Sequence, residues 1–196
     1  MNSAFSRFDR DSQFAPIFIL GTMPRSGTNF LYNLICLHLD CRGCFIGEDF
    51  LVSRSDLLIK YVDSLYQQWP PRWKVRETIG SPNLLCQYIG YSLIEFLNLP
   101  ASDLSGSPPK RLVTKTPRIR NIEHFFTLFP HAYLLIIIRD GRSVIESGVK
   151  SFNWLYEDSI REWADTAQTV LDFQHDMQNT NHKFLIVRYE DIYNET

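Results

Sequence analysis

The sequence predicts one α/β domain with a central parallel sheet and an inserted helical segment. Three observations support this prediction. Short apolar runs with the length of buried strands alternate with longer segments in which apolar residues have helical spacing. The first run leads through a polar loop with glycine into a helix. The chain has 196 residues, 44% of them apolar, which suits a single globular domain over residues 1–196.

Four apolar runs are expected to form the buried strands. They comprise residues 16–21 (PIFILG), 111–114 (RLVT), 133–138 (YLLIII) and 184–188 (FLIVR). Helices are expected over residues 30–39, 119–130 and 159–177, and in the segment that follows Gly141. Pro130 is expected to end the second of these helices, because proline cannot continue the backbone hydrogen bonding.

Residues 50–110 interrupt this alternation. The segment contains a predicted helix over residues 83–99, and it places Trp69 and Trp73 around Pro70 and Pro71, a pattern unusual for a core strand. We interpret it as a helical insertion that covers one face of the sheet.

The composition argues against two classes of partner. The net charge is −2 and the Lys and Arg residues are spread along the chain, so nucleic acid is not expected to bind. The longest fully apolar run, residues 132–138, is far shorter than the ~20 residues of a membrane span. Residues 1–14 lack the apolar stretch of a secretory signal. We therefore expect a cytoplasmic protein.

The four cysteines do not form a recognisable metal site. Cys41 and Cys44 make a CxxC pair, but a structural zinc site needs two further ligands, and no second pair is present. We interpret the cysteines as reduced, partly buried thiols.

The loop after the first strand, residues 21–28 (GTMPRSGT), has the features of an anion-binding turn. A loop between a strand and a helix directs backbone N–H groups at one point, and the helix N-terminus adds partial positive charge. The pattern is close to the nucleotide P-loop, but it is one residue longer and lacks the lysine, so Arg25 supplies the charge. The alternative is a tight turn in which Ser26 caps the helix.

A second motif, residues 139–147 (RDGRSVIES), follows the most apolar strand. Arg139 ends that strand, at the sheet edge where open α/β proteins bind ligands. Ser147 lies about two turns into the next helix, so that its hydroxyl and the guanidinium converge on one phosphate. The alternatives are a surface ion pair for Arg139 and a solvated position for Ser147.

Together the motifs resemble the PAPS-dependent sulfotransferase superfamily. PRSGT, IIIRDGRSVIES and VRYED occur in that order, and TKTPRIRNIEHFFTLFPHAYLLIIIRDGRSVIES with the pair Gly47–Glu48 is most similar to the tyrosylprotein-type and related bacterial branch. The resemblance covers residues 17–191, with the insertion poorly matched. It implies a P-loop-like three-layer fold and transfer of a sulfuryl group from 3′-phosphoadenosine 5′-phosphosulfate (PAPS) to a hydroxyl acceptor, without a metal.

The resemblance also implies a nucleotide site. The residues matched to the 5′-phosphosulfate are Arg25, Ser26, Gly27, Thr28 and Asn29. The family usually has a second threonine where Asn29 stands. Arg139 and Ser147 match the pair that binds the 3′-phosphate. Tyr189 matches a tyrosine that contacts the nucleotide, and its alternative is a core tyrosine at a strand end.

Two further residues are implied as catalytic. Glu48 matches the base that takes the proton of the acceptor hydroxyl, with Asp49 directly beside it. Lys115 matches the lysine that stabilises charge on the oxygen leaving sulfur, and its alternative is a solvated lysine. Cytosolic sulfotransferases have a histidine base two residues after this lysine. Pro117 stands there, which favours the glutamate base.

Other interpretations stay open at this stage. A P-loop kinase-like phosphotransferase would need the missing lysine and magnesium ligands, and an inactive nucleotide-binding fragment would bind without turnover. The acceptor is a peptide, a glycan or a small molecule. Tyr61, Tyr66, Trp69 and Trp73 either line its groove or pack the insertion.

The chain ends a few residues past the last strand, where sulfotransferases of this kind continue with further helices. We therefore expect the C-terminal part of the family domain to be absent. We also expect the apolar edge at residues 184–187 to promote self-association.

Overall fold

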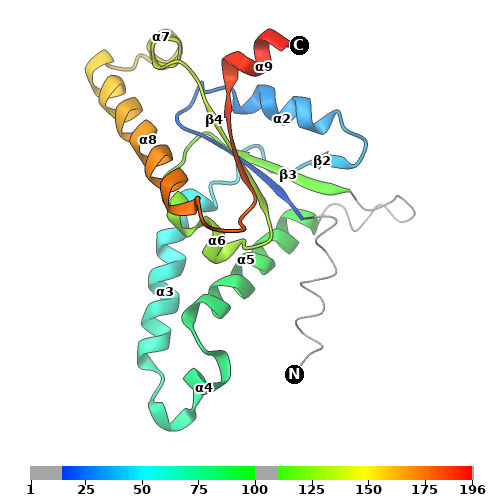
Figure 1. The fold of residues 1–196 in the computed structure, drawn as a ribbon, viewed down its shortest axis with the longest axis vertical. Coiled ribbons are helices and arrows are strands. Elements are labelled where there is room, and N and C mark those ends of the chain that lie inside the picture. Colours follow the sequence, from blue (N-terminus) through cyan, green and yellow to red (C-terminus); the bar gives the residue numbers. More distant parts are fainter. Residues whose placement is uncertain (1–14, 100–109, 196) are drawn as a thin grey trace.

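A computed structural model describes residues 15–99 and 110–195 of the chain, and in this part five parallel strands form one sheet with the order β2-β3-β1-β4-β5 (Figure 1). The strands are β1 (Ile17–Gly21), β2 (Cys41–Gly43), β3 (Arg111–Thr116), β4 (Tyr133–Ile138) and β5 (Phe184–Arg188). The chain winds to one side of β1 for β2 and β3, and to the other side for β4 and β5. Open α/β sheets bind ligands at such a reversal, outside the carboxyl ends of the strands, and here the reversal lies at β1.

The structure confirms the four predicted strands and adds a fifth. β4 and β5 have the predicted bounds, and β1 begins one residue later than expected. β3 continues to Thr116, so that Lys115 lies within the strand and not after it. β2 was missed because it has only three residues, all partly exposed at the sheet edge.

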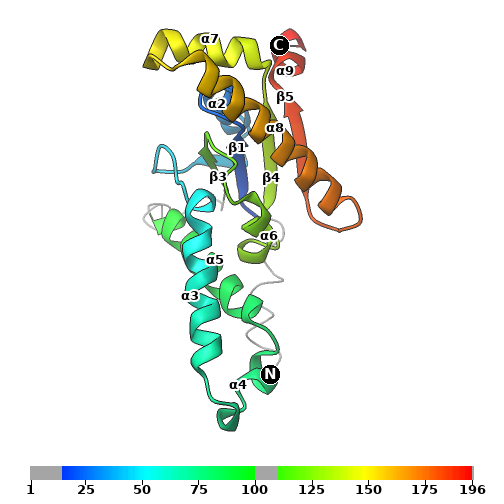
Figure 2. The ribbon, with the colours of Figure 1, turned by 90° about the vertical axis from the view of Figure 1, so that its left-hand side faces the viewer.

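Helices cover both faces of the sheet, which gives the predicted three layers. On one face, α2 (Thr28–Cys36) and α9 (Tyr189–Glu195) pack on a core that contains Ile19, Val113 and Ile137. The other face presents Phe18 and Leu20 to η5 (Ile122–His124), α6 (Phe125–Leu128) and α8 (Tyr156–Met177). α7 (Gly141–Phe152) follows β4 above the carboxyl edge of the sheet (Figure 2).

The predicted helix over residues 119–130 is much shorter in the structure, because Asn121 has a left-handed backbone (φ +61°) at its start and Phe129 precedes Pro130 at its end. Only residues 122–128 are helical, as a 3-10 turn followed by one α-helical turn. The rings of Phe125 and Phe129 pack against Phe18 at centroid distances of 5.3 and 4.7 Å, and all three are 1% exposed or less. The backbone leaves the helix at Phe129 (φ −126°).

In its described part, residues 50–99, the insertion contains η2 (Val52–Arg54), α3 (Ser55–Gln68), η3 (Pro71–Trp73), α4 (Val75–Ile79) and α5 (Pro82–Asn98). The expectation that it covers a face of the sheet holds only in part, because Val52, Val62 and Cys86 join the core that contains Phe18 and Leu20. α3 and α5 pack on each other and on η5 and α6, while α4 lies far from the strands (Figures 1 and 2). Gly90 allows the close approach of α5 to α6, because a Cβ there would lie 2.0 Å from the carbonyl oxygen of Leu128.

The helices of the described ranges include none that is both long and apolar enough to cross a membrane.

Candidate active site

The loop between β1 and α2 is fixed by its own buried polar groups. The Ser26 hydroxyl accepts a hydrogen bond from the Met23 N–H (3.1 Å) and donates one to the Met23 carbonyl (2.6 Å). It also lies 2.9 Å from the Thr22 hydroxyl. Gly27 is the N-cap of α2 and no side chain caps this helix, so the alternative with Ser26 as N-cap is wrong. The first N–H groups of α2, beginning at Thr28 and Asn29, therefore lack a side-chain cap at the point where an anion would bind.

Positive φ angles give the loop its shape. Gly27 has φ +101°, and Arg25 has φ +76°, which is uncommon for a residue with a side chain. The face of Gly27 is covered by Tyr189, because a Cβ on Gly27 would lie 2.4 Å from the ring. Glycine is therefore required at this position both by backbone conformation and by space.

Tyr189 also contacts two other groups of the site. Its ring lies under the Arg139 guanidinium, with 4.4 Å from the guanidinium carbon to the ring centroid. The ring of Phe30 contacts it edge-on at 5.6 Å. In the structure Tyr189 packs against Gly27 and the Arg139 side chain. Its contact with a nucleotide stays a prediction.

Arg25, Arg139 and Ser147 meet beside this loop. The Arg25 Nε donates to the Ser147 hydroxyl (2.9 Å), and the Arg139 Nη1 donates to the Arg25 carbonyl oxygen (3.2 Å). An open pocket of about 310 Å³ adjoins them, and its lining is Arg139, Ser143, Glu146, Ser147, Lys150 and Ser151. The two sequence motifs, more than a hundred residues apart, therefore form one cationic and hydroxyl-rich site.

Asp140 caps the helix that carries Ser147. Its carboxylate accepts hydrogen bonds from the N–H groups of Arg142 (2.9 Å) and Ser143 (3.2 Å). The backbone N–H of Asp140 donates to the Glu190 carboxylate (2.8 Å). The Arg142 side chain, followed by the Ser143 N–H, lowers the pKa of Asp140 from 3.8 to about 2. The cap fixes the start of α7 next to Arg139.

The lowered pKa of Asp140 gives a pH-dependent prediction. A carboxyl group with a depressed folded-state pKa contributes stability that is present above pH 4 and is lost as the pH falls toward 2. Asparagine caps helices comparably but carries no charge. We therefore expect the free energy of unfolding of wild type to exceed that of Asp140→Asn at pH 6, and the difference to shrink below pH 4. Urea unfolding at several pH values measures it, and a constant difference would contradict the prediction.

Lys115 and Glu48 form an ion pair beside α2. The Lys115 Nζ lies 3.6 Å from the Glu48 Oε1, and the lysine side chain is 10% exposed against 37% for the glutamate. The Lys115 ammonium also lies 5.8 Å from the ring centroid of Tyr32, the fifth residue of α2. A lysine buried to this degree needs an anionic partner, so the interpretation as a solvated lysine is wrong.

Asp49, adjacent to Glu48, is turned the other way. Its carboxylate accepts hydrogen bonds from the hydroxyls of Thr114 (2.6 Å) and Thr116 (3.2 Å) and from the Leu51 N–H (2.8 Å). Burial raises the pKa of Asp49, and these hydrogen bonds act in the opposite direction. The Asp49 carboxylate is thus hydrogen-bonded to β3, while the Glu48 carboxylate is partly exposed.

Sequence reasoning missed Tyr32, Thr114, Thr116 and Asp140 as parts of the site. The alternation of TKT gave a usable signal, because residues on either side of a strand lysine must point to the opposite face. Among the described residues no group of three or more His, Cys, Asp and Glu is placed to hold a metal ion, and the four cysteines are free thiols.

A model of the sulfotransferase family matches residues 16–196. The chain belongs to the sulfotransferase family. It is 24% identical over 163 residues to protein-tyrosine sulfotransferase 1 of Homo sapiens, covering 79% of this chain and 41% of that protein. It is 23% identical over 163 residues to protein-tyrosine sulfotransferase 1 of Danio rerio, covering 79% and 43%. The chain thus spans about two fifths of the length of these curated relatives.

A solved sulfotransferase structure supports the fold. The sulfotransferase domain from the olefin synthase of Synechococcus PCC 7002 matches with a TM-score of 0.55 and 18% identity, covering 92% of this chain and 68% of that one. The match to the family model spans both the Arg25 loop and the Arg139–Ser147 segment.

Proposed function

We propose that this chain transfers a sulfuryl group from PAPS to a hydroxyl acceptor. The observation that carries the proposal is the Lys115–Glu48 ion pair beside α2, the helix that begins at the Arg25 loop. Sulfuryl transfer needs a base for the acceptor proton and a cation for the charge on the leaving oxygen, and this pair offers one of each.

The chain offers groups for both ends of the donor. Arg25, with the loop from Ser26 to Asn29, suits the 5′-phosphosulfate, and Arg139 with Ser147 suits the 3′-phosphate. The hydrogen bonds from Arg25 to Ser147 and from Arg139 to the Arg25 carbonyl support this assignment, because they put the two groups of residues next to each other. The Tyr189 ring stabilises this arrangement by packing against Gly27 and the Arg139 guanidinium.

The reaction needs one proton to be removed and one charge to be stabilised. Glu48 accepts the acceptor hydroxyl proton as the new oxygen–sulfur bond forms. Lys115 stabilises the negative charge that grows on the 5′-phosphate oxygen as its bond to sulfur breaks, which leaves 3′-phosphoadenosine 5′-phosphate (PAP). No metal is needed in this scheme, because the fixed cations are those of Arg25 and Lys115.

The names of the relatives supply the first acceptor to test, which is a tyrosine side chain of a protein. Packing within the insertion does not suggest an acceptor groove there. Tyr66 and Trp69 contact each other at 6.1 Å, and Arg76 lies over the Tyr66 ring at 5.1 Å. These side chains stabilise the insertion itself.

The proposal predicts transfer from ³⁵S-labelled PAPS to at least one member of a panel of tyrosine peptides, glycans and small phenols or alcohols. We expect the rate to be unchanged by EDTA, and we expect no transfer of phosphate from labelled ATP with Mg²⁺. Phosphate transfer without sulfuryl transfer would favour the kinase-like alternative. Binding of PAP without any turnover would favour an inactive nucleotide-binding fragment.

A further inference from the structure

The segment that carries Glu48 is attached to β3 on both sides of Lys115. Asp49 accepts hydrogen bonds from Thr114 and Thr116, the residues that precede and follow Lys115. The Asp49 N–H donates to the Lys115 carbonyl (3.2 Å), and the Phe50 N–H donates to the Thr116 hydroxyl (3.0 Å). Both threonines are fully buried, so these bonds are partly shielded from water.

The backbone at this attachment is strained. Phe50 has φ +51°, a left-handed conformation that is costly for a bulky residue. Such a conformation persists only where the surroundings enforce it, and it occurs most often at functional sites. The hydrogen bonds of Asp49, Phe50 and Leu51 provide that enforcement.

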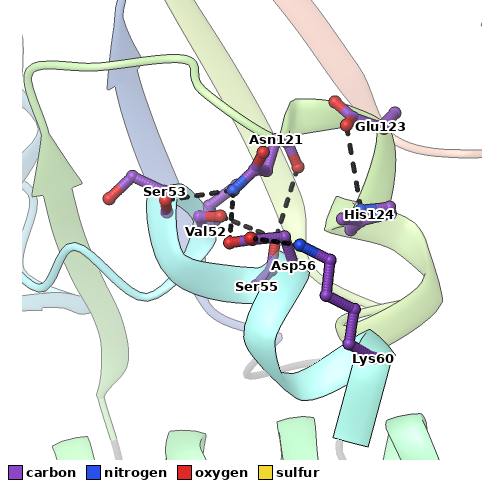
Figure 3. A network of polar contacts seen from close by, with 8 residues as sticks. All are labelled: Val52, Ser53, Ser55, Asp56, Lys60, Asn121, Glu123 and His124. Carbon is purple, nitrogen blue, oxygen red and sulfur yellow. Dashed lines mark hydrogen bonds and ion pairs between the residues drawn. The ribbon is translucent and has the colours of Figure 1, made fainter. Parts of the chain in front are cut away.

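A second attachment joins the same two segments farther along (Figure 3). Asn121, also left-handed with φ +61°, donates through Nδ2 to the Ser53 carbonyl and to the Asp56 carboxylate, both at 3.0 Å. The Ser55 hydroxyl donates to the Val52 carbonyl (2.7 Å) and lies 3.4 Å from the Asn121 carbonyl. The segment after Glu48 and the segment after Lys115 are therefore bonded at two points.

We infer that Asp49 is a positioning residue, which fixes the Glu48 carboxylate against the Lys115 ammonium. On β3, Lys115 points to the face opposite Thr114 and Thr116, because side chains alternate along a strand. Asp49 is hydrogen-bonded on the face of β3 that carries the threonines. This directs Glu48, the preceding residue, to the face that carries Lys115. Two neighbouring carboxylates thus have separate tasks, one positioning and one facing the proposed acceptor.

The role in turnover rests on the proposed function. A displacement of a catalytic group by about 1 Å lowers the rate roughly 10²-fold. We therefore expect Asp49→Ala to lower kcat about 100-fold while the Kd for PAP changes less than twofold. Asp49→Asn keeps an acceptor oxygen and should restore kcat at least tenfold relative to Asp49→Ala. Val170→Ala, a core change on α8, is the matched control that lowers stability and keeps kcat.

An NMR measurement tests the same inference without turnover. Glu48→Gln should shift the ¹⁵Nζ resonance of Lys115 in the wild-type background and leave it unchanged in the Asp49→Ala background. If Asp49→Ala does not fold, Thr116→Val removes the hydroxyl between Asp49 and Phe50 and serves in its place. An equal shift in both backgrounds, or an undiminished kcat, would overturn the inference. A protein that transfers no sulfuryl group but shows the background-dependent shift would disprove the proposed function alone.

Discussion

Replacing Glu48 with glutamine should remove nearly all sulfuryl transfer and leave PAP binding intact. The amide has almost the same shape as the carboxylate but cannot accept the acceptor's proton, and loss of a general base costs about 10²–10⁴ in rate. Arg25, Arg139 and Ser147, the proposed phosphate ligands, are untouched by the change. The measurement is kcat with ³⁵S-labelled PAPS, together with calorimetric titration of PAP.

The controls separate this effect from a loss of folding. Lys115 is buried, so removing its anionic partner also has a stability cost, although the amide oxygen of glutamine can still accept a hydrogen bond from its ammonium. Thermal unfolding should therefore be measured in parallel, and activity should be assayed well below the midpoint. Glu48→Asp offers a milder comparison, because it keeps the carboxylate and moves it back by one methylene group. Full activity of Glu48→Gln would exclude Glu48 as the base.

The fold was largely predictable because buried parallel strands are apolar on both faces. The run at residues 133–138 coincides with β4, which lies inside the sheet. The run at 184–188 coincides with β5, which has a similarly apolar sequence although it is an edge strand with Leu185 57% exposed. β2 could not be found in this way. It is a three-residue edge strand with the polar Arg42, which is hydrogen-bonded to Asn98 at the far end of α5. Such a strand exists only through its pairing with β3.

The position of the insertion depends on contacts that no local pattern contains. α5 approaches α6 where Gly90 meets the backbone of Leu128, thirty-eight positions apart in sequence. The helical spacing at residues 83–99 predicted the helix itself, since α5 is Pro82–Asn98. It carried no information about which neighbour the helix would meet.

The candidate site divides in the same way. The anion-binding loop and the Arg139–Ser147 pair were predicted from residue type and their place after strands, and the structure brings them together through Arg25. The sequence alone left Glu48 and Asp49 almost interchangeable. In the structure Asp49 is hydrogen-bonded to Thr114 and Thr116, while Glu48 is paired with Lys115. These contacts depend on the unforeseen extension of β3 to Thr116.

Arg139→Ala should weaken PAP binding at least tenfold. A hydrogen bond with a charged group contributes about 1.5–3 kcal/mol, which corresponds to roughly 10- to 150-fold in Kd. Arg139 is suited to the 3′-phosphate, which ATP lacks, so wild type should bind PAP much more tightly than ATP and the variant should lose this preference. Calorimetric titration of both nucleotides with both proteins measures the effect.

The controls for Arg139 follow from its contacts. Arg142 lies three residues after Arg139, but its side chain is 94% exposed and paired with Asp140. Arg142→Ala changes the net charge as much as Arg139→Ala does and should weaken PAP binding less than threefold. Arg139→Lys keeps the charge but loses the planar fork that contacts both Tyr189 and the Arg25 carbonyl, and should bind with intermediate affinity. If Arg142→Ala weakened PAP as much as Arg139→Ala, the effect would be one of general charge. If wild type bound ATP as tightly as PAP, the assignment of Arg139 and Ser147 to the 3′-phosphate would be wrong, because ATP has no 3′-phosphate.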